Sequence, residues 1–190
     1  MMNIICFGDS NTYGYDPCSF FGDPYDEQNC WVDILAGKLN CTVINAGENG
    51  REIPRREEAV RCVNRMLETQ KPADLLIVML GSNDILQGNP VEMITKHMET
   101  FLLQIKLDKS KILLISPPYM NLGEWVTTQS QIHVSQKLSA EYRYLAQRLG
   151  IRYADAEKWG VALTFDGVHF TEEGHRAFAE GLYHYLKEGE

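Results

Sequence analysis

The sequence predicts an α/β fold, in which helices cover both faces of a mostly parallel β-sheet. Apolar segments of strand length alternate along the chain with stretches in which apolar residues recur at helical spacing. One segment, Leu75–Leu80, is apolar at every position, as expected for a strand that is covered on both faces. The expected strands are Asn3–Phe7, Thr42–Asn45, Leu75–Leu80, Ile112–Ser116 and Ile151–Asp155.

Helical stripes of apolar residues lie between the expected strands. The clearest stripe runs from Val91 to Ile105, with apolar residues about every 3.6 positions. The shorter stripes are Trp31–Leu39, Val60–Leu67, Leu138–Leu149 and Phe178–Leu186. Two long segments without a pattern, Tyr15–Asn29 and Pro117–Ile132, lie at or near the carboxyl ends of strands, and we expect them to shape a pocket.

Length and charge exclude several classes of protein. The chain has 190 residues, enough for one well-buried core, and we expect a single domain spanning residues 1–190. The net charge is −8 and no basic cluster is long enough to follow a phosphate backbone, so nucleic acid is not an expected partner. No apolar run reaches the roughly 18 residues that span a membrane. The first strand begins at Asn3, which leaves no room for a signal segment and predicts a cytoplasmic protein.

The cysteines indicate neither a disulfide framework nor a zinc site. Their number is odd and no C-x-x-C pair occurs. They are Cys6, Cys18, Cys30, Cys41 and Cys62. A metal pair made of His169 and His175 is excluded by its spacing, because the two are neither three nor four residues apart.

Polar residues and glycines gather in four clusters near the expected ends of strands. These clusters are residues 8–14, 45–50, 81–84 and 166–169. Because parallel strands bring their carboxyl ends to one edge of a sheet, we expect the clusters to meet there. Taken singly, each cluster has an ordinary reading as a helix cap or a strand-to-helix turn.

Together the clusters supply the groups needed for acyl transfer. Ser10 is a candidate nucleophile that directly follows the first strand. Asp166 lies three residues ahead of His169 on a glycine-containing turn, where it can reach the Nδ1–H of the imidazole and leave Nε2 free to accept a proton from a serine. The side-chain amide of Asn83 can donate to a developing oxyanion, and the glycines of residues 45–50 allow a backbone N–H to approach a ligand.

These clusters resemble the sequence blocks of the SGNH hydrolases, also called the GDSL lipase/esterase family. The matching residues are Gly-Asp-Ser-Asn at 8–11, Gly-Ser-Asn-Asp at 81–84 and Asp-Gly-Val-His at 166–169, and the family usually has leucine at the position of Asn11. The resemblance implies a flavodoxin-like three-layer α/β/α sandwich with a five-stranded parallel sheet. It also implies that Ser10 is the nucleophile, His169 the base and Asp166 the residue that orients it.

The resemblance further implies an oxyanion hole with three donors. These would be the backbone N–H of Ser10, the side chain of Asn83 and a glycine N–H from the second cluster. Gly47 and Gly50 compete for the third role. Gly50 is preferred because its distance from Asn45 looks like the family's Asn-x-x-x-x-Gly.

The activity implied by the resemblance is that of a serine esterase acting on short-chain carboxylic esters through an acyl-enzyme. Residues 13–17 and 48–51 resemble the small intracellular arylesterase and acyltransferase branch, some members of which form oligomers. We therefore expect a small-molecule ester as the partner, with acyltransferase activity and a homo-oligomer as further expectations. Neither a metal nor an organic cofactor is expected.

Other functions remain open from the sequence. Within the same family, the alternatives are a carbohydrate O-acetyl esterase and an acyl-thioesterase or lysophospholipase. Outside enzymes, a flavodoxin-like module could hold a phosphate or nucleotide, although neither G-x-G-x-x-G nor a Walker pattern is present. A scaffold built on a decayed hydrolase is disfavoured because all four clusters are intact.

Overall fold

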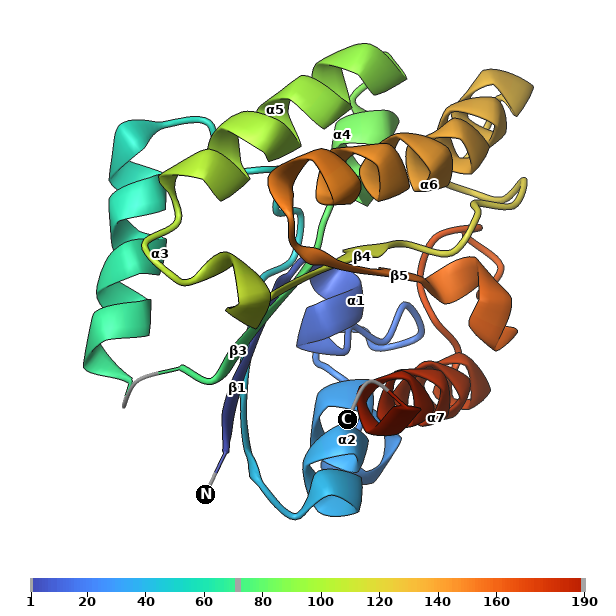
Figure 1. The fold of residues 1–190 in the computed structure, drawn as a ribbon. Helices are drawn as coiled ribbons and strands as arrows, with labels where there is room; N and C mark the ends of the chain where they lie inside the picture. Colours follow the sequence, from blue (N-terminus) through green and yellow to red (C-terminus); the bar gives the residue numbers. More distant parts are fainter. Residues whose placement is uncertain (1, 71–72, 189–190) are drawn as a thin grey trace.

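A parallel five-stranded sheet forms the centre of the part of the protein that the structure describes, residues 2–70 and 73–188 of a computed structural model (Figure 1). The strand order is β2-β1-β3-β4-β5. The strands are β1 (Asn3–Gly8), β2 (Thr42–Gly47), β3 (Leu75–Met79), β4 (Ile112–Ser116) and β5 (Arg152–Asp155). All neighbouring pairs are parallel, which confirms the predicted sheet.

Helices cover both faces of the sheet and complete the predicted three-layer sandwich (Figure 1). One face packs against α3 (Glu57–Thr69), α5 (Val91–Gln104) and α6 (Gln129–Leu149). The other face packs against α2 (Trp31–Leu39) and α7 (Glu172–Glu188). Two short helices, α1 (Ser10–Tyr13) and α4 (Ser82–Leu86), directly follow β1 and β3 at the carboxyl edge.

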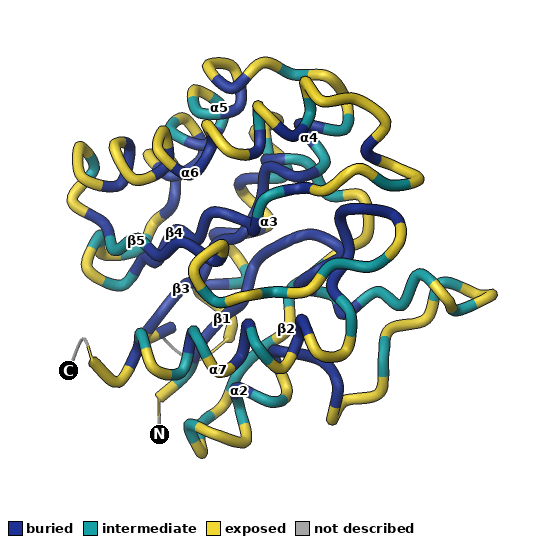
Figure 2. Tube along the Cα trace, turned by 90° about the vertical axis from the view of Figure 1, so that its right-hand side faces the viewer, coloured by how far each residue is buried: buried dark blue, intermediate teal, exposed yellow. Residues whose placement is uncertain are grey.

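The side chains of β1 contribute to two hydrophobic cores, one on each face of the sheet. Ile5 and Phe7 face α3, α5 and α6, whereas Ile4 and Cys6 face α2 and α7. Strands β3 and β4 are buried at every residue, as the unbroken apolar pattern of Leu75–Leu80 predicts for β3. Figure 2 shows both strands as buried trace through the centre of the molecule. Strand β2 lies at the edge of the sheet and is half-buried. The sheet is therefore rigid beneath β1 and β3, the strands that lead into the candidate site.

Two local predictions of element bounds were wrong. The segment expected to be irregular up to Ile132 ends at Thr128, because Thr128 and Gln131 form a capping box that begins α6. Strand β2 extends two residues beyond its predicted end at Asn45. Both errors are at element boundaries, where local hydrogen bonds decide the outcome.

Two further observations concern the described residues. Across residues 2–70 and 73–188, no helix combines the length and the apolar character needed to cross a bilayer. Within the same residues, no three His, Cys, Asp or Glu side chains are grouped so that they can hold a metal ion. The five cysteines are free.

Candidate active site

Three strands bring the predicted site residues to the carboxyl edge of the sheet. Gly8 at the end of β1 pairs with Gly47 of β2 on one side and with Met79 of β3 on the other. Ser10 follows β1 by two residues, and Asn83 lies in α4 just after β3. The structure therefore places the first three clusters side by side, and the loop before α7 adds the fourth.

Ser10, His169 and Asp166 form a continuous chain of hydrogen-bonding contacts. Ser10 Oγ lies 2.9 Å from His169 Nε2, and His169 Nδ1 lies 2.6 Å from Asp166 Oδ2. All three residues are buried. The sequence-predicted trio is thus assembled with each imidazole nitrogen facing a single partner.

The Asp166 carboxylate is held by more than the imidazole. Its Oδ1 accepts hydrogen bonds from the backbone N–H groups of Val168 and His169, both at 2.9 Å. Burial raises the pKa of Asp166, but the hydrogen bonds from His169 and Val168 outweigh burial and hold the pKa well below its ordinary value. Asp166 is therefore an anion at neutral pH, and it favours the tautomer with a proton on Nδ1 of the imidazole.

The turn that presents Ser10 is fixed by its own cap. The Asp9 side chain accepts a hydrogen bond from the backbone N–H of Asn11 at 3.0 Å and caps the one-turn helix α1. Gly14, in the left-handed region, ends that helix. Burial raises the pKa of Asp9 to about 6. Among the described residues, the backbone N–H of Ser10 has no hydrogen-bond partner, so it is free to donate to a ligand.

Gly47 and Gly50 differ in what their N–H groups can do. The N–H of Gly47 donates to the side-chain oxygen of Asn45 at 2.9 Å and is occupied. The N–H of Gly50 has no partner within the described residues. Gly50 has a φ of +73° with open space around its Cα, whereas a Cβ on Gly47 would lie 2.1 Å from the backbone nitrogen of Tyr13. Gly47 is therefore needed for close packing against Tyr13, whereas the backbone N–H of Gly50 is available to a ligand.

The loop that carries Gly50 is tied to the helix that carries Asn83. Asn83 Nδ2 donates to the carbonyl oxygen of Arg51 at 3.1 Å, which leaves its second amide hydrogen for a ligand. Asp84 Oδ2 accepts a hydrogen bond from the N–H of Ile53 at 3.0 Å. These two contacts fix the second and third clusters relative to each other.

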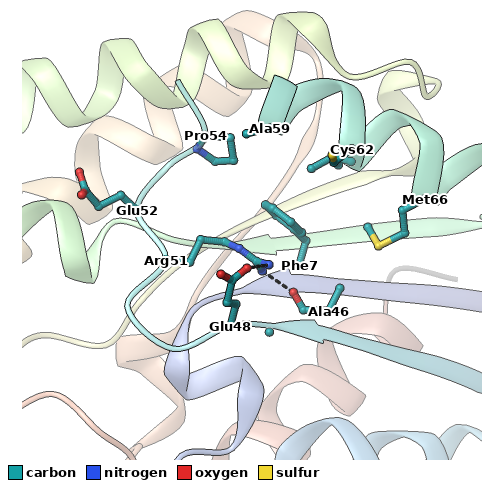
Figure 3. A pocket seen from close by; sticks show the side chains of 11 residues that line it. Phe7, Ala46, Glu48, Arg51, Glu52, Pro54, Ala59, Cys62 and Met66 are labelled. Carbon is teal, nitrogen blue, oxygen red and sulfur yellow. Dashed lines mark hydrogen bonds and ion pairs between the residues drawn. The ribbon is translucent and has the colours of Figure 1, made fainter. Parts of the chain in front are cut away.

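Arg51 holds the same loop from behind, in the wall of a cavity of about 540 Å³ (Figure 3). Its Nη1 donates to the carbonyl oxygen of Gly8 at 2.7 Å and to that of Ala46. Its Nη2 pairs with Glu48 Oε2 at 2.6 Å, and its guanidinium carbon lies 4.3 Å from the centre of the Phe7 ring. The guanidinium thus joins the ends of β1 and β2 to the loop. Sequence reasoning missed this role because nothing local marks a side chain that turns back into the sheet.

Two aromatic side chains flank the imidazole of His169. The ring centre of Tyr15 lies 4.7 Å from that of His169, and the ring centre of Trp125 lies 5.0 Å from it. They come from the two long irregular segments that were expected to shape a pocket. Trp125 is 46% exposed, so it forms part of the surface beside the site and does not belong to the core.

The sequence also matches the model of a known protein family. The model of the GDSL-like lipase/acylhydrolase family matches residues 6–177. The chain belongs to this family. The match spans all four clusters, confirms the resemblance seen in the sequence and places the chain among the carboxylic ester hydrolases. A module that only binds phosphate or nucleotide is set aside by this finding.

Solved structures agree with this fold. A proposed arylesterase of Agrobacterium tumefaciens is 27% identical, with a TM-score of 0.85, and the match covers 99% of each chain. A carbohydrate acetylesterase family member of Sinorhizobium meliloti is 25% identical, with a TM-score of 0.84, over 99% of this chain and 98% of the other. An M. smegmatis aryl esterase is 24% identical, with a TM-score of 0.84 over 99% of each chain, and supports the fold. No curated protein sequence gives a significant match.

Proposed function

We propose that this family member is a serine esterase that hydrolyses short-chain carboxylic esters, with residues 1–190 acting as a single domain. Ser10 is the nucleophile, His169 the general base and Asp166 the residue that orients the base. The observation that carries the proposal is the buried chain of contacts from Ser10 Oγ through both imidazole nitrogens to Asp166 Oδ2.

The mechanism begins with proton transfer from Ser10 to Nε2 of His169 as Oγ attacks the ester carbonyl carbon. The carbonyl oxygen becomes an oxyanion, which accepts hydrogen bonds from the N–H groups of Ser10 and Gly50 and from the Asn83 amide. As the C–O bond to the alcohol breaks, His169 returns the proton to the leaving oxygen. Water then repeats the sequence on the acyl-enzyme, giving the carboxylic acid and free Ser10. An alcohol in place of water would give the acyltransfer product.

The surroundings of His169 support small substrates. Because His169 protonates the leaving oxygen, the alcohol part of the ester must pass beside the rings of Tyr15 and Trp125. These walls favour a flat or short alcohol over a long flexible one. The similarity to the S. meliloti carbohydrate acetylesterase family member supports a second candidate, removal of acetyl groups from a carbohydrate.

A homo-oligomer is proposed from one surface feature. Phe20 and Phe21 stack edge to face and are 94% and 85% exposed, which is unusual for adjacent phenylalanines on a monomer. Light scattering coupled to gel filtration tests this for the wild type and a Phe20→Ser, Phe21→Ser variant. A dimer or larger species that the variant loses supports the proposal, and a monomeric wild type contradicts it.

The esterase proposal is tested by turnover of p-nitrophenyl acetate, butyrate and octanoate by the wild type and Ser10→Ala. We expect activity that falls with acyl length and disappears in the variant. Acetylated xylan and glucose pentaacetate, assayed by acetate release, test the second candidate. A folded wild type without turnover of any of these esters would contradict the proposed function.

A further inference from the structure

The side chain of Asn11 bridges the two catalytic segments of the site. Asn11 directly follows Ser10, and its Nδ2 donates to the carbonyl oxygen of Val168 at 3.1 Å. Its Oδ1 accepts a hydrogen bond from the N–H of Phe170 at 3.0 Å. One side-chain amide is therefore hydrogen-bonded to the backbone on both sides of His169. Its orientation is set by its partners, because the reversed amide would place donor against donor and acceptor against acceptor.

The bridge is buried, and the oxygen and the nitrogen of its amide each have a hydrogen-bond partner. Asn11, Val168 and Phe170 are 3%, 5% and 0% exposed, so water does not readily replace the amide. The backbone of Asn11 is bonded as well, through its N–H to Asp9 and through its carbonyl oxygen to the indole N–H of Trp31. An apolar side chain of the same shape would leave a buried carbonyl and a buried N–H without partners.

We propose that Asn11 is a positioning residue that aligns His169 Nε2 with Ser10 Oγ. This inference rests on the proposed function. Each end of the bridge is the immediate neighbour of a reacting residue, since Asn11 follows Ser10 while Val168 and Phe170 flank His169. A shift of the His169 loop relative to Ser10 must therefore break one of the two hydrogen bonds. The place where this chain departs from the family's usual leucine is thus a link between nucleophile and base.

A second asparagine provides a matched control away from the site. Asn64 Nδ2 donates to the carbonyl oxygen of Gln104 at 3.0 Å, and its Oδ1 accepts a hydrogen bond from the N–H of Lys106 at 2.8 Å. The pattern is the same, a carbonyl and an N–H two residues apart. Asn64 is also buried, but it joins α3 to the C-terminal end of α5 and the residues just after it. Comparing variants of the two asparagines separates the effect of losing a buried amide from the effect of losing the alignment between His169 and Ser10.

The first test compares Asn11→Leu with Asn64→Leu by thermal unfolding and by kcat and KM for p-nitrophenyl acetate. Active sites are counted by fluorophosphonate titration, so that unfolded protein does not enter kcat. We expect both variants to lower the melting temperature. Only Asn11→Leu should lower kcat, by roughly 10- to 100-fold with little change in KM, since a misplacement of about 1 Å costs that much. A kcat for Asn11→Leu within twofold of wild type, or an equal loss in Asn64→Leu, would overturn the inference.

Asn11→Asp provides a second test that does not depend on Asn11→Leu folding. The aspartate still accepts the Phe170 N–H, but it can donate to the Val168 carbonyl only when protonated. The ratio of its kcat to that of the wild type should therefore rise as the pH falls from 8 to 5. A ratio independent of pH would overturn the inference. If the wild type itself shows no Ser10-dependent turnover, the proposed function fails instead, so the two failures are distinguishable.

Discussion

The two halves of the candidate site are built in opposite ways. In the base half, Ser10, His169 and Asp166 hold one another through contacts of 2.6 and 2.9 Å between their own reacting atoms. In the oxyanion half, the N–H groups of Ser10 and Gly50 have no partner among the described residues. In the proposed mechanism these donors receive the substrate oxygen and have to remain unbonded until it arrives, so this half cannot be held by its own functional groups.

The oxyanion half is instead held by side chains that do not themselves serve as oxyanion donors. Arg51 fastens the loop to the strand ends, and Asp84 accepts the N–H of Ile53. The comparison teaches that substitutions act differently in the two halves. A change in the base half removes a reacting or orienting group, whereas a change behind the oxyanion loop displaces a donor that is still present.

The carboxylates of Asp166 and Asp84, one in each half of the site, also differ in how many hydrogen bonds they receive and in their pKa. Asp166 receives three hydrogen-bonding contacts, and these hold its pKa well below the ordinary value. Asp84 receives one hydrogen bond from a backbone N–H, and burial raises its pKa to about 6. Its Oδ1 lies 4.0 Å from Nδ1 of His97, too far for a hydrogen bond. Asp166 thus keeps its charge at all ordinary pH values, whereas Asp84 gains a proton in mildly acidic solution.

The largest of these effects is expected for Asp166→Asn. An amide in place of the carboxylate neither stabilises the imidazolium nor fixes the tautomer of His169, and the loss in kcat should be about 10⁴-fold. Steady-state kinetics with p-nitrophenyl acetate measures this loss. A loss smaller than tenfold, with unchanged folding, would mean that Asp166 does not orient the base.

Asn83→Ala should cost less, on the order of 10²–10³-fold in kcat, the usual loss for one oxyanion donor. KM should change little, because the donor acts mainly on the charge of the transition state. The variant also removes the contact to the Arg51 carbonyl, so its melting temperature is measured alongside. A loss below tenfold would show that Asn83 has been misassigned.

Arg51→Met sharpens the comparison, because it changes no group that touches substrate. We expect kcat to fall roughly 10- to 100-fold through displacement of the Gly50 loop. Arg55→Met is the matched control, since Arg55 pairs with Glu52 at the same three-residue spacing but has no hydrogen bond to a strand end among the described residues. Equal kinetics in the two variants would contradict the support assigned to Arg51.

The smallest effect is a pH dependence of stability that arises in the oxyanion half. The pKa of Asp84 rises from 3.8 to about 6 on folding, so the folded state binds more protons than the unfolded state between pH 4 and 6. The free energy of unfolding should therefore fall as the pH rises through this window. The side chain introduced by Asp84→Asn stays neutral at every pH. The variant should therefore reduce the decrease in the free energy of unfolding over this pH range by an amount on the order of 1 kcal/mol. Urea unfolding from pH 4 to 7 measures it, and parallel curves would refute the assignment.

The parts of the protein predicted best from sequence depend on nearby residues. Leu75–Leu80 was identified as a buried strand because its own pattern reports burial on both faces. The contact between Asp166 and His169 was expected because a turn of three residues makes it almost unavoidable. Chain order along a parallel sheet then brought both to the edge where Ser10 lies.

The supports of the site could not be predicted, because they depend on partners far along the chain. Asn11 reaches backbone groups 157 and 159 residues away, and Arg51 reaches 43 residues back to Gly8. Trp125 beside His169 depends on the path of a loop without a periodic pattern. Such contacts follow from tertiary packing, and a local sequence pattern carries no signal for them.

The most direct test of the central claim, that Ser10 is activated by His169, is intact-mass analysis after treatment with a fluorophosphonate. We predict a single adduct on the wild-type protein, absent from Ser10→Ala and formed far more slowly on His169→Ala. Circular dichroism of each protein shows that it is folded. A folded wild type that gains no adduct, or a Ser10→Ala variant that still gains it, would contradict this account.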